Sequence, residues 1–130
     1  MGWVHLVDDA APLAATFGDL SIITPTVTLH ELTVVREGPA VQLRIDVAEF
    51  PASPPAKWRN DNTVQVTLSL EGVTGLRLTG IGTSMAVTLD AERDLTTQAV
   101  TWTMRSATLN GSVTSRFSRI AKVSAYRNGE

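Results

Sequence analysis

Histidines and paired carboxylates are the side chains of this sequence that could act on a substrate or hold a metal. The two histidines are His5 and His30, and His30-Glu31 is not followed by the second histidine of a helical zinc site. The residues around His30 predict a strand, where positions four apart do not meet as they do on a helix. The sequence has no cysteine, which excludes thiolate metal sites and a cysteine nucleophile. We therefore expect no metal and no cofactor.

The glycine motifs and the neighbouring carboxylates do not predict catalysis either. Gly80-Ile81-Gly82 lacks the third glycine of a dinucleotide-binding loop, and Gly82-Thr83-Ser84 lacks the glycine that follows the serine of a nucleophile elbow. Carboxylate pairs such as Asp8 with Asp9 resemble a glycosidase site, but a chain with 13 acidic residues offers many such pairs. These residues favour a binding protein over an enzyme.

Alternating apolar and polar residues predict the strands that would carry a binding surface. They are residues 27–35, 41–47 and 64–70, a short strand around Leu76 and Leu78 that turns back from the third, and a strand through Met85, Val87 and Leu89. The segment Arg36-Glu37-Gly38-Pro39 is typical of a turn, so the first two strands should form a hairpin.

Asn110-Gly111 predicts a second hairpin, because this pair tolerates the positive φ angles of a two-residue turn. Such a turn would pair Leu109 with Ser112, Met104 with Phe117 and Trp102 with Arg119. In that register one face, which should be the core face, carries Trp102, Met104, Val113 and Phe117. The residues after Lys122 predict one more strand.

Two segments of the first half of the chain, residues 8–18 and 50–62, lack the alternation of apolar and polar residues that predicts strands. Asp8 or Asp9 could cap a short helix through Pro12 and Phe17, which Gly18 would end. The connection of residues 50–62 contains three prolines and cannot be an ordinary strand. The sequence therefore predicts one all-β domain over residues 1–130, an antiparallel sandwich or strongly curved sheet of about seven or eight strands with one short N-terminal helix.

Composition and charge limit the partners of such a domain. With 43% hydrophobic residues, a formal charge of -2 and no long apolar run, the chain is expected to be soluble and cytoplasmic, with no attraction to nucleic acid or membrane. The charge is uneven, since residues 95–129 contain no Asp or Glu but include Arg116 and Arg119. This stretch is either a solvated sheet edge or a cationic face for an acidic partner.

The loop of residues 50–62 holds the other candidate contacts. Trp58 lies between Lys57 and Arg59, and Trp and Arg are residue types that dominate many interfaces. Trp58 either contributes to such an interface or folds back over the open end of the sheet. The candidate partner-binding residues are Lys57, Trp58, Arg59, Arg116 and Arg119.

Two ordered stretches of the sequence carry a family resemblance. The first runs from Phe17-Gly18 through His30-Glu31-Leu32 to Leu43-Arg44-Ile45-Asp46, and the second from Phe50-Pro51 through Pro55-Ala56-Lys57-Trp58 to Gly72-Val73. Together they resemble the Immunity protein 50 family of bacterial polymorphic-toxin systems. The resemblance implies a non-catalytic protein that binds and neutralises a cognate protein toxin. We expect the chain to be a monomer or weak homodimer.

Two other functions fit the residues. A carbohydrate-binding module would use Trp3 and Trp58 as a platform for sugar rings. A structural subunit would instead assemble through exposed sheet edges.

Overall fold

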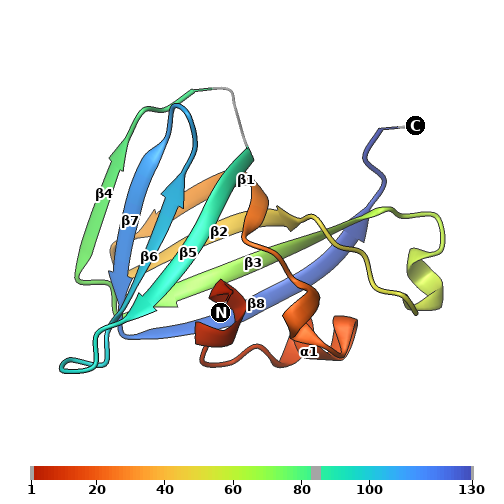
Figure 1. Ribbon diagram of the computed structural model, residues 1–130, viewed down its shortest axis with the longest axis horizontal. Helices are drawn as coiled ribbons and strands as arrows, with labels where there is room; N and C mark the ends of the chain where they lie inside the picture. The colour runs from red at the N-terminus through yellow and green to blue at the C-terminus, as the bar shows by residue number, and fades with distance from the viewer. Residues whose placement is uncertain (1, 83–85, 130) are drawn as a thin grey trace.

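The computed structural model describes residues 2–82 and 86–129, which form one antiparallel sheet with a short helical segment at the N-terminus (Figure 1). The strands are β1 (Thr26–Val35), β2 (Ala40–Val47), β3 (Thr63–Glu71), β4 (Gly75–Thr79), β5 (Ala86–Arg93), β6 (Val100–Arg105), β7 (Asn110–Ser115) and β8 (Phe117–Tyr126). Their order across the sheet is β4-β7-β6-β5-β1-β2-β3-β8. The predicted fold class is confirmed as a curved sheet of eight strands.

Alternation along the central strands gives the sheet an apolar inner face. Val41, Leu43 and Ile45 of β2 are at most 1% exposed, and the matching residues of β3 are equally buried. Because the sheet curves strongly, β4 to β7 lie across from β2, β3 and β8 and enclose this core between them (Figure 1). One core residue, Trp102 of β6, is fully buried as its position in the sequence predicted.

The N-terminal segment closes one side of the core. It contains the 3-10 helices η1 (Trp3–Leu6) and η2 (Leu20–Ile22) around the helix α1 (Ala11–Phe17). Trp3 is 1% exposed and meets the Trp102 ring edge-on, with ring centroids 6.5 Å apart. The predicted short helix is confirmed, since the Asp9 side chain accepts a hydrogen bond from the backbone N–H of Ala11 and the helix ends at Gly18 with a φ of 75°.

The hairpin predicted at Asn110-Gly111 is wrong in its register. β6 pairs with β7 so that Trp102 lies opposite Val113 and Met104 opposite Gly111, and the turn occupies residues 106–109. Ser106 stabilises that turn, because its hydroxyl accepts hydrogen bonds from the backbone N–H groups of Thr108 and Leu109. Gly111 lies inside the strand instead of at the turn.

The same register shift moves one predicted core residue to the surface. Trp102, Met104 and Val113 are buried as expected, but Phe117 begins β8 and is 43% exposed. The strand β7 ends before Arg116 and β8 begins after it. Residues 112–119, predicted as the single returning strand of the hairpin, are therefore divided between two strands.

The short strand around Leu76 and Leu78 is present as β4, but its partner differs from the prediction. β4 pairs with β7 at one edge of the sheet, and the outer neighbour of β3 is β8. The strand after it is confirmed at Val87 and Leu89, whereas Met85 and the loop serine Ser84 lie outside the described residues.

Candidate functional site

The outer face of β5 and β6 carries a broad groove of about 970 Å³. The register places Asp90 opposite Thr103 and Glu92 opposite Thr101 on this face. The alternate residues Leu89, Met104 and Trp102 point to the core, so the polar row is held on a rigid apolar base. The pairing of two neighbouring strands therefore builds the groove.

Two ion pairs neutralise part of the charge in this groove. An Arg105 Nη2 to Asp90 Oδ2 distance of 2.9 Å forms the first pair, and Arg93 Nη2 lies 3.6 Å from Asp8 Oδ1 in the second. Glu92 is exposed and has no ion-pair partner within residues 2–82 and 86–129. The groove thus retains negative charge beside its paired arginines.

The turn between β5 and β6 lines one end of the groove with Asp94 and Leu95. The Asp94 carboxylate accepts hydrogen bonds from the backbone N–H groups of Thr96 and Thr97, at 2.8 and 3.2 Å. Arg93 donates to the carbonyl of Gln98 across the same turn at 2.9 Å. These bonds fix the turn that presents Leu95, whose side chain is 84% exposed. An ordered turn thus holds an apolar side chain in water beside carboxylates.

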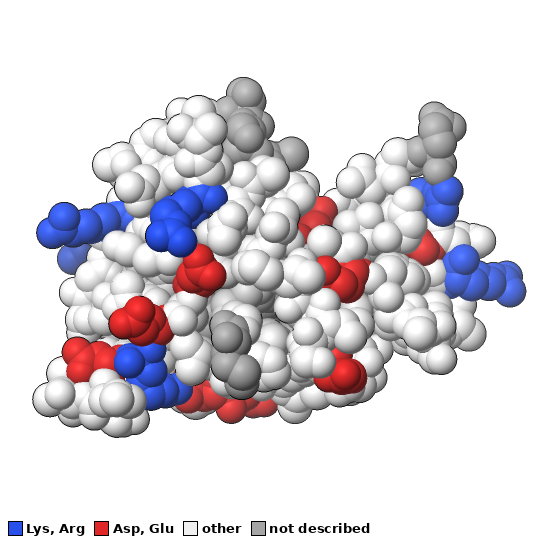
Figure 2. Space-filling model, in the orientation of Figure 1, with Lys and Arg blue, Asp and Glu red and all other residues white. Residues whose placement is uncertain are grey.

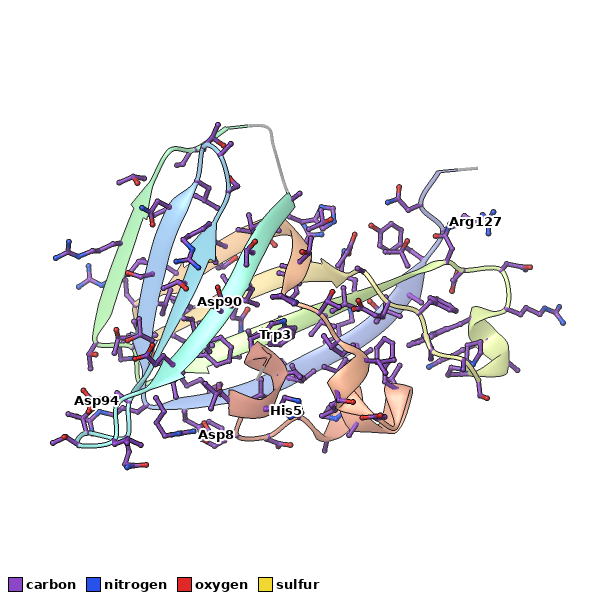
Figure 3. The ribbon with its side chains drawn as sticks, viewed as in Figure 1. Trp3, His5, Asp8, Asp90, Asp94 and Arg127 are labelled. Carbon is purple, nitrogen blue, oxygen red and sulfur yellow. The ribbon has the colours of Figure 1, made fainter. Side chains whose placement is uncertain are left out.

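The N-terminal segment continues the negative surface away from the groove. Figure 3 shows Asp94 at the end of β5, Asp90 midway along it and Asp8 beside the N-terminal segment. Hydrogen bonds from the side chain and the backbone of Ser21 lower the pKa of Asp19 below its usual value. In Figure 2, acidic side chains lie across the middle and the left of this face; on the left they alternate with Lys and Arg side chains, and further Lys and Arg side chains lie at the right.

The candidate residues of the 50–62 loop are divided between surface and core. Trp58 is 7% exposed and packs against the Phe50 ring, with ring centroids 6.4 Å apart, so it covers the end of the sheet. Lys57 and Arg59 flank it on the 3-10 helix η3 (Ala56–Trp58) and its cap, and both are exposed. Because Trp3 is buried as well, these tryptophans do not form the open platform that a carbohydrate-binding module would need.

Arg116 and Arg119 lie at the other end of β8. Arg119 donates to Glu71 at 2.8 Å, and this hydrogen bond is the main reason that the pKa of Glu71 is lowered. The 50–62 loop ends beside Tyr126, which lies ten residues along the chain from Arg116 and seven from Arg119, or roughly 33 Å and 23 Å of strand. The structure does not bring the five predicted contacts together, and their role in binding stays a prediction.

A polar cluster joins four strands on the outer face of the other half of the sheet. Asp46 is 5% exposed and accepts hydrogen bonds from the Tyr126 hydroxyl and from Gln65 Nε2, while His30 Nε2 lies 2.7 Å from its Oδ2. A β-bulge between Leu29 and Glu31 turns His30 toward this carboxylate. The cluster raises the pKa of Tyr126 to about 12, mainly through the hydrogen bond to Asp46. Its groups satisfy one another, which fits a structural role.

A smaller, mostly apolar hollow of about 450 Å³ lies between β1 and the end of β4. Leu32, Leu78 and Ile81 line it, and its one carboxylate, Glu31, is ion-paired with Arg44. This hollow could accept an apolar side chain, but it lacks the charge that distinguishes the β5–β6 groove.

The family model that describes Immunity protein 50 matches residues 9–126. The chain belongs to the Immunity protein 50 family. The match starts at Asp9, whose backbone bridges to Arg119 of β8, and ends with the last residue of β8, so it spans all eight strands. No curated protein and no solved structure matches this chain.

The region matched to Immunity protein 50 includes the groove as well as the predicted contacts. Sequence reasoning missed Asp90 and Glu92, because only the pairing of β5 with β6 brings them to one face with Thr101 and Thr103. Within the described parts of this family member, no group of His, Asp and Glu side chains could hold a metal ion. None of the described helices is long and apolar enough to span a membrane.

Proposed function

We propose that this chain is an immunity protein that binds a cognate protein toxin in the cytoplasm and neutralises it by occlusion, with no chemical step of its own. The observation that carries the proposal is membership of the Immunity protein 50 family over residues 9–126, which covers the whole sheet. Family membership implies the role of the protein, and the toxin is its natural partner.

The architecture supports binding by a preformed surface. The inner face of the sheet is filled by apolar side chains, including Trp3 and Trp102, so its strands are held rigidly against one another. A rigid surface loses little conformational entropy when it meets a partner, which favours tight inhibition. The outer faces remain polar and available for contact.

The test is capture combined with rescue. The tagged chain is expressed in its producing strain, and co-purifying proteins are identified by mass spectrometry at moderate salt. We expect to recover one stoichiometric partner. Expression of that partner alone should arrest the growth of a host, and co-expression of the chain should restore growth. A partner whose expression harms no host, or growth arrest that the folded chain does not relieve, would contradict the proposal.

Two parallel measurements address the other functions. Binding of the folded chain to a glycan array would favour the carbohydrate-binding alternative. Self-association seen by sedimentation at high concentration would favour assembly through the edge strands β4 and β8.

A further inference from the structure

We propose that the outer face of β5 and β6, with the Leu95 turn, is the docking surface for the toxin, and that the toxin meets it with a basic surface. This inference rests on the proposed function and identifies the site and the partner's chemistry. Shape, an exposed apolar side chain and the distribution of charge support it independently.

The shape of this face suits a protruding partner surface. The groove of about 970 Å³ is open along the paired strands, and its floor is formed by the short side chains of Thr101 and Thr103. Glu92 and Arg105, whose side chains are longer, also line it. A partner side chain can enter here without any movement of the backbone of β5 or β6.

Leu95 provides the apolar element that a charged groove alone would lack. It is 84% exposed at the tip of a turn that the Asp94 and Arg93 side chains hold in place. Interfaces commonly surround a few apolar contacts with polar and charged residues. A fixed leucine beside the groove is therefore suited to pack against a partner while the carboxylates orient it.

Charge decides the kind of partner. Residues 2–25 and 86–105 together carry six carboxylates and two arginines, a formal charge of -4, whereas the whole chain has -2. The remaining residues are therefore net positive. The groove itself carries Asp90, Glu92 and Asp94 against Arg93 and Arg105, and the N-terminal segment adds three carboxylates and no Lys or Arg. Such a face repels nucleic acid and acidic proteins and attracts a protein with clustered Lys or Arg side chains.

The first experiment uses a peptide of lysines as the probe. The isotope-labelled chain is titrated with decalysine while its backbone amide resonances are followed by NMR at low and at physiological salt. The largest shifts are expected in residues 90–95 and 101–105, and affinity should fall as salt rises. Largest shifts in β8 or in the 50–62 loop would overturn the assignment.

Matched charge reversals make the test specific. Glu92→Lys changes an exposed, unpaired carboxylate of the groove, and Glu37→Lys makes the same change in the β1–β2 turn, where Glu37 is also exposed and has no ion-pair partner within the described chain. Glu92→Lys should weaken decalysine binding by about fivefold, and Glu37→Lys by less than about twofold. Equal effects of the two variants would overturn the proposal.

The toxin captured in the experiment above provides the second arm. Glu92→Lys should slow its association by about fivefold, and Leu95→Ser should speed its dissociation by roughly tenfold, with Glu37→Lys near wild type. If the captured toxin is insensitive to both groove variants, or slows only with Arg116→Glu and Arg119→Glu, the docking assignment is wrong while the immunity function stands. If capture yields no toxin, the immunity function fails, and the decalysine map alone decides whether this face binds basic proteins.

Discussion

Tyr126 is the sole tyrosine of the chain, so its ionisation can be followed directly by ultraviolet absorbance. Its hydroxyl donates to Asp46, a buried carboxylate that cannot easily accept a second negative charge beside it. This hydrogen bond, with burial and repulsion from Asp46, raises the pKa of Tyr126 to about 12 from an ordinary value of 10.0. At about pH 11 only about one tenth of the folded protein should carry tyrosinate, against about nine tenths of the unfolded chain.

The shift also predicts how stability depends on pH. A pKa that is higher in the folded state means that the protonated hydroxyl is favoured there, so its contribution is fully present below about pH 10 and is lost as pH rises toward about 12. Two pKa units correspond to about 2.7 kcal/mol, and partial exposure of the ring reduces this to on the order of 1–2 kcal/mol. Tyr126→Phe should therefore lower the free energy of unfolding by this amount at about pH 8 and by almost nothing near pH 12.

The decisive perturbation is Asp46→Asn, which keeps the shape of the side chain and removes its charge. The tyrosinate midpoint should fall by about one unit or more. Asp61→Asn is the matched control, because Asp61 lies in the neighbouring loop and should leave the midpoint unchanged. Circular dichroism recorded in parallel identifies the pH at which the chain unfolds. A folded wild-type midpoint near that of the urea-unfolded chain would refute the role assigned to Asp46.

Three further predictions concern stability and are measured by urea unfolding. Gly80→Ala should cost more than about 3 kcal/mol, because a Cβ there would lie 1.6 Å from a backbone carbonyl oxygen, whereas Gly18→Ala, also at positive φ but in open space, should cost about 1–2 kcal/mol. Arg119→Ala should cost less than about 1 kcal/mol at neutral pH; because Arg119 lowers the Glu71 pKa in the folded state, this loss should begin to shrink as pH falls below the ordinary Glu71 pKa and disappear only below the lowered one. Trp58→Ala should cost about 3 kcal/mol, because the ring is buried against Phe50. Equal costs for the two glycine variants, an Arg119→Ala cost that persists in acid, or a neutral Trp58→Ala would each contradict the corresponding contact.

The strands with one wet and one dry face could be predicted from the sequence. In β2 and β3 every second residue is buried, so the period of the sequence and the period of burial coincide. The turn between β1 and β2 could also be predicted from neighbouring residues alone, since Gly38 and Pro39 favour a turn in any context. Fold class follows from such local patterns.

Register and partner choice depended on contacts that are distant in sequence. Asn110-Gly111 is a strong turn signal, but Ser106 satisfies two backbone N–H groups of an earlier turn. Gly111 is used for packing, because a Cβ there would lie 3.1 Å from both Leu78 and Met104. The groove could not be predicted from the sequence either, because it depends on the register that places Asp90 opposite Thr103.

The position of β8 has a consequence for the synthesis of the protein. β8 is the last strand of the chain, yet it pairs along the whole length of β3, and the backbone of Asp9 hydrogen-bonds to Ser118 and Ile120 on its other side. A chain still growing on the ribosome can pair β3 with β2, but the other edge of β3 is open and the N-terminal segment lacks the strand on which it docks. Because such long-range pairing forms late and slowly, the sheet completes only after translation has passed residue 126. A half-made chain therefore offers no completed sheet to any partner.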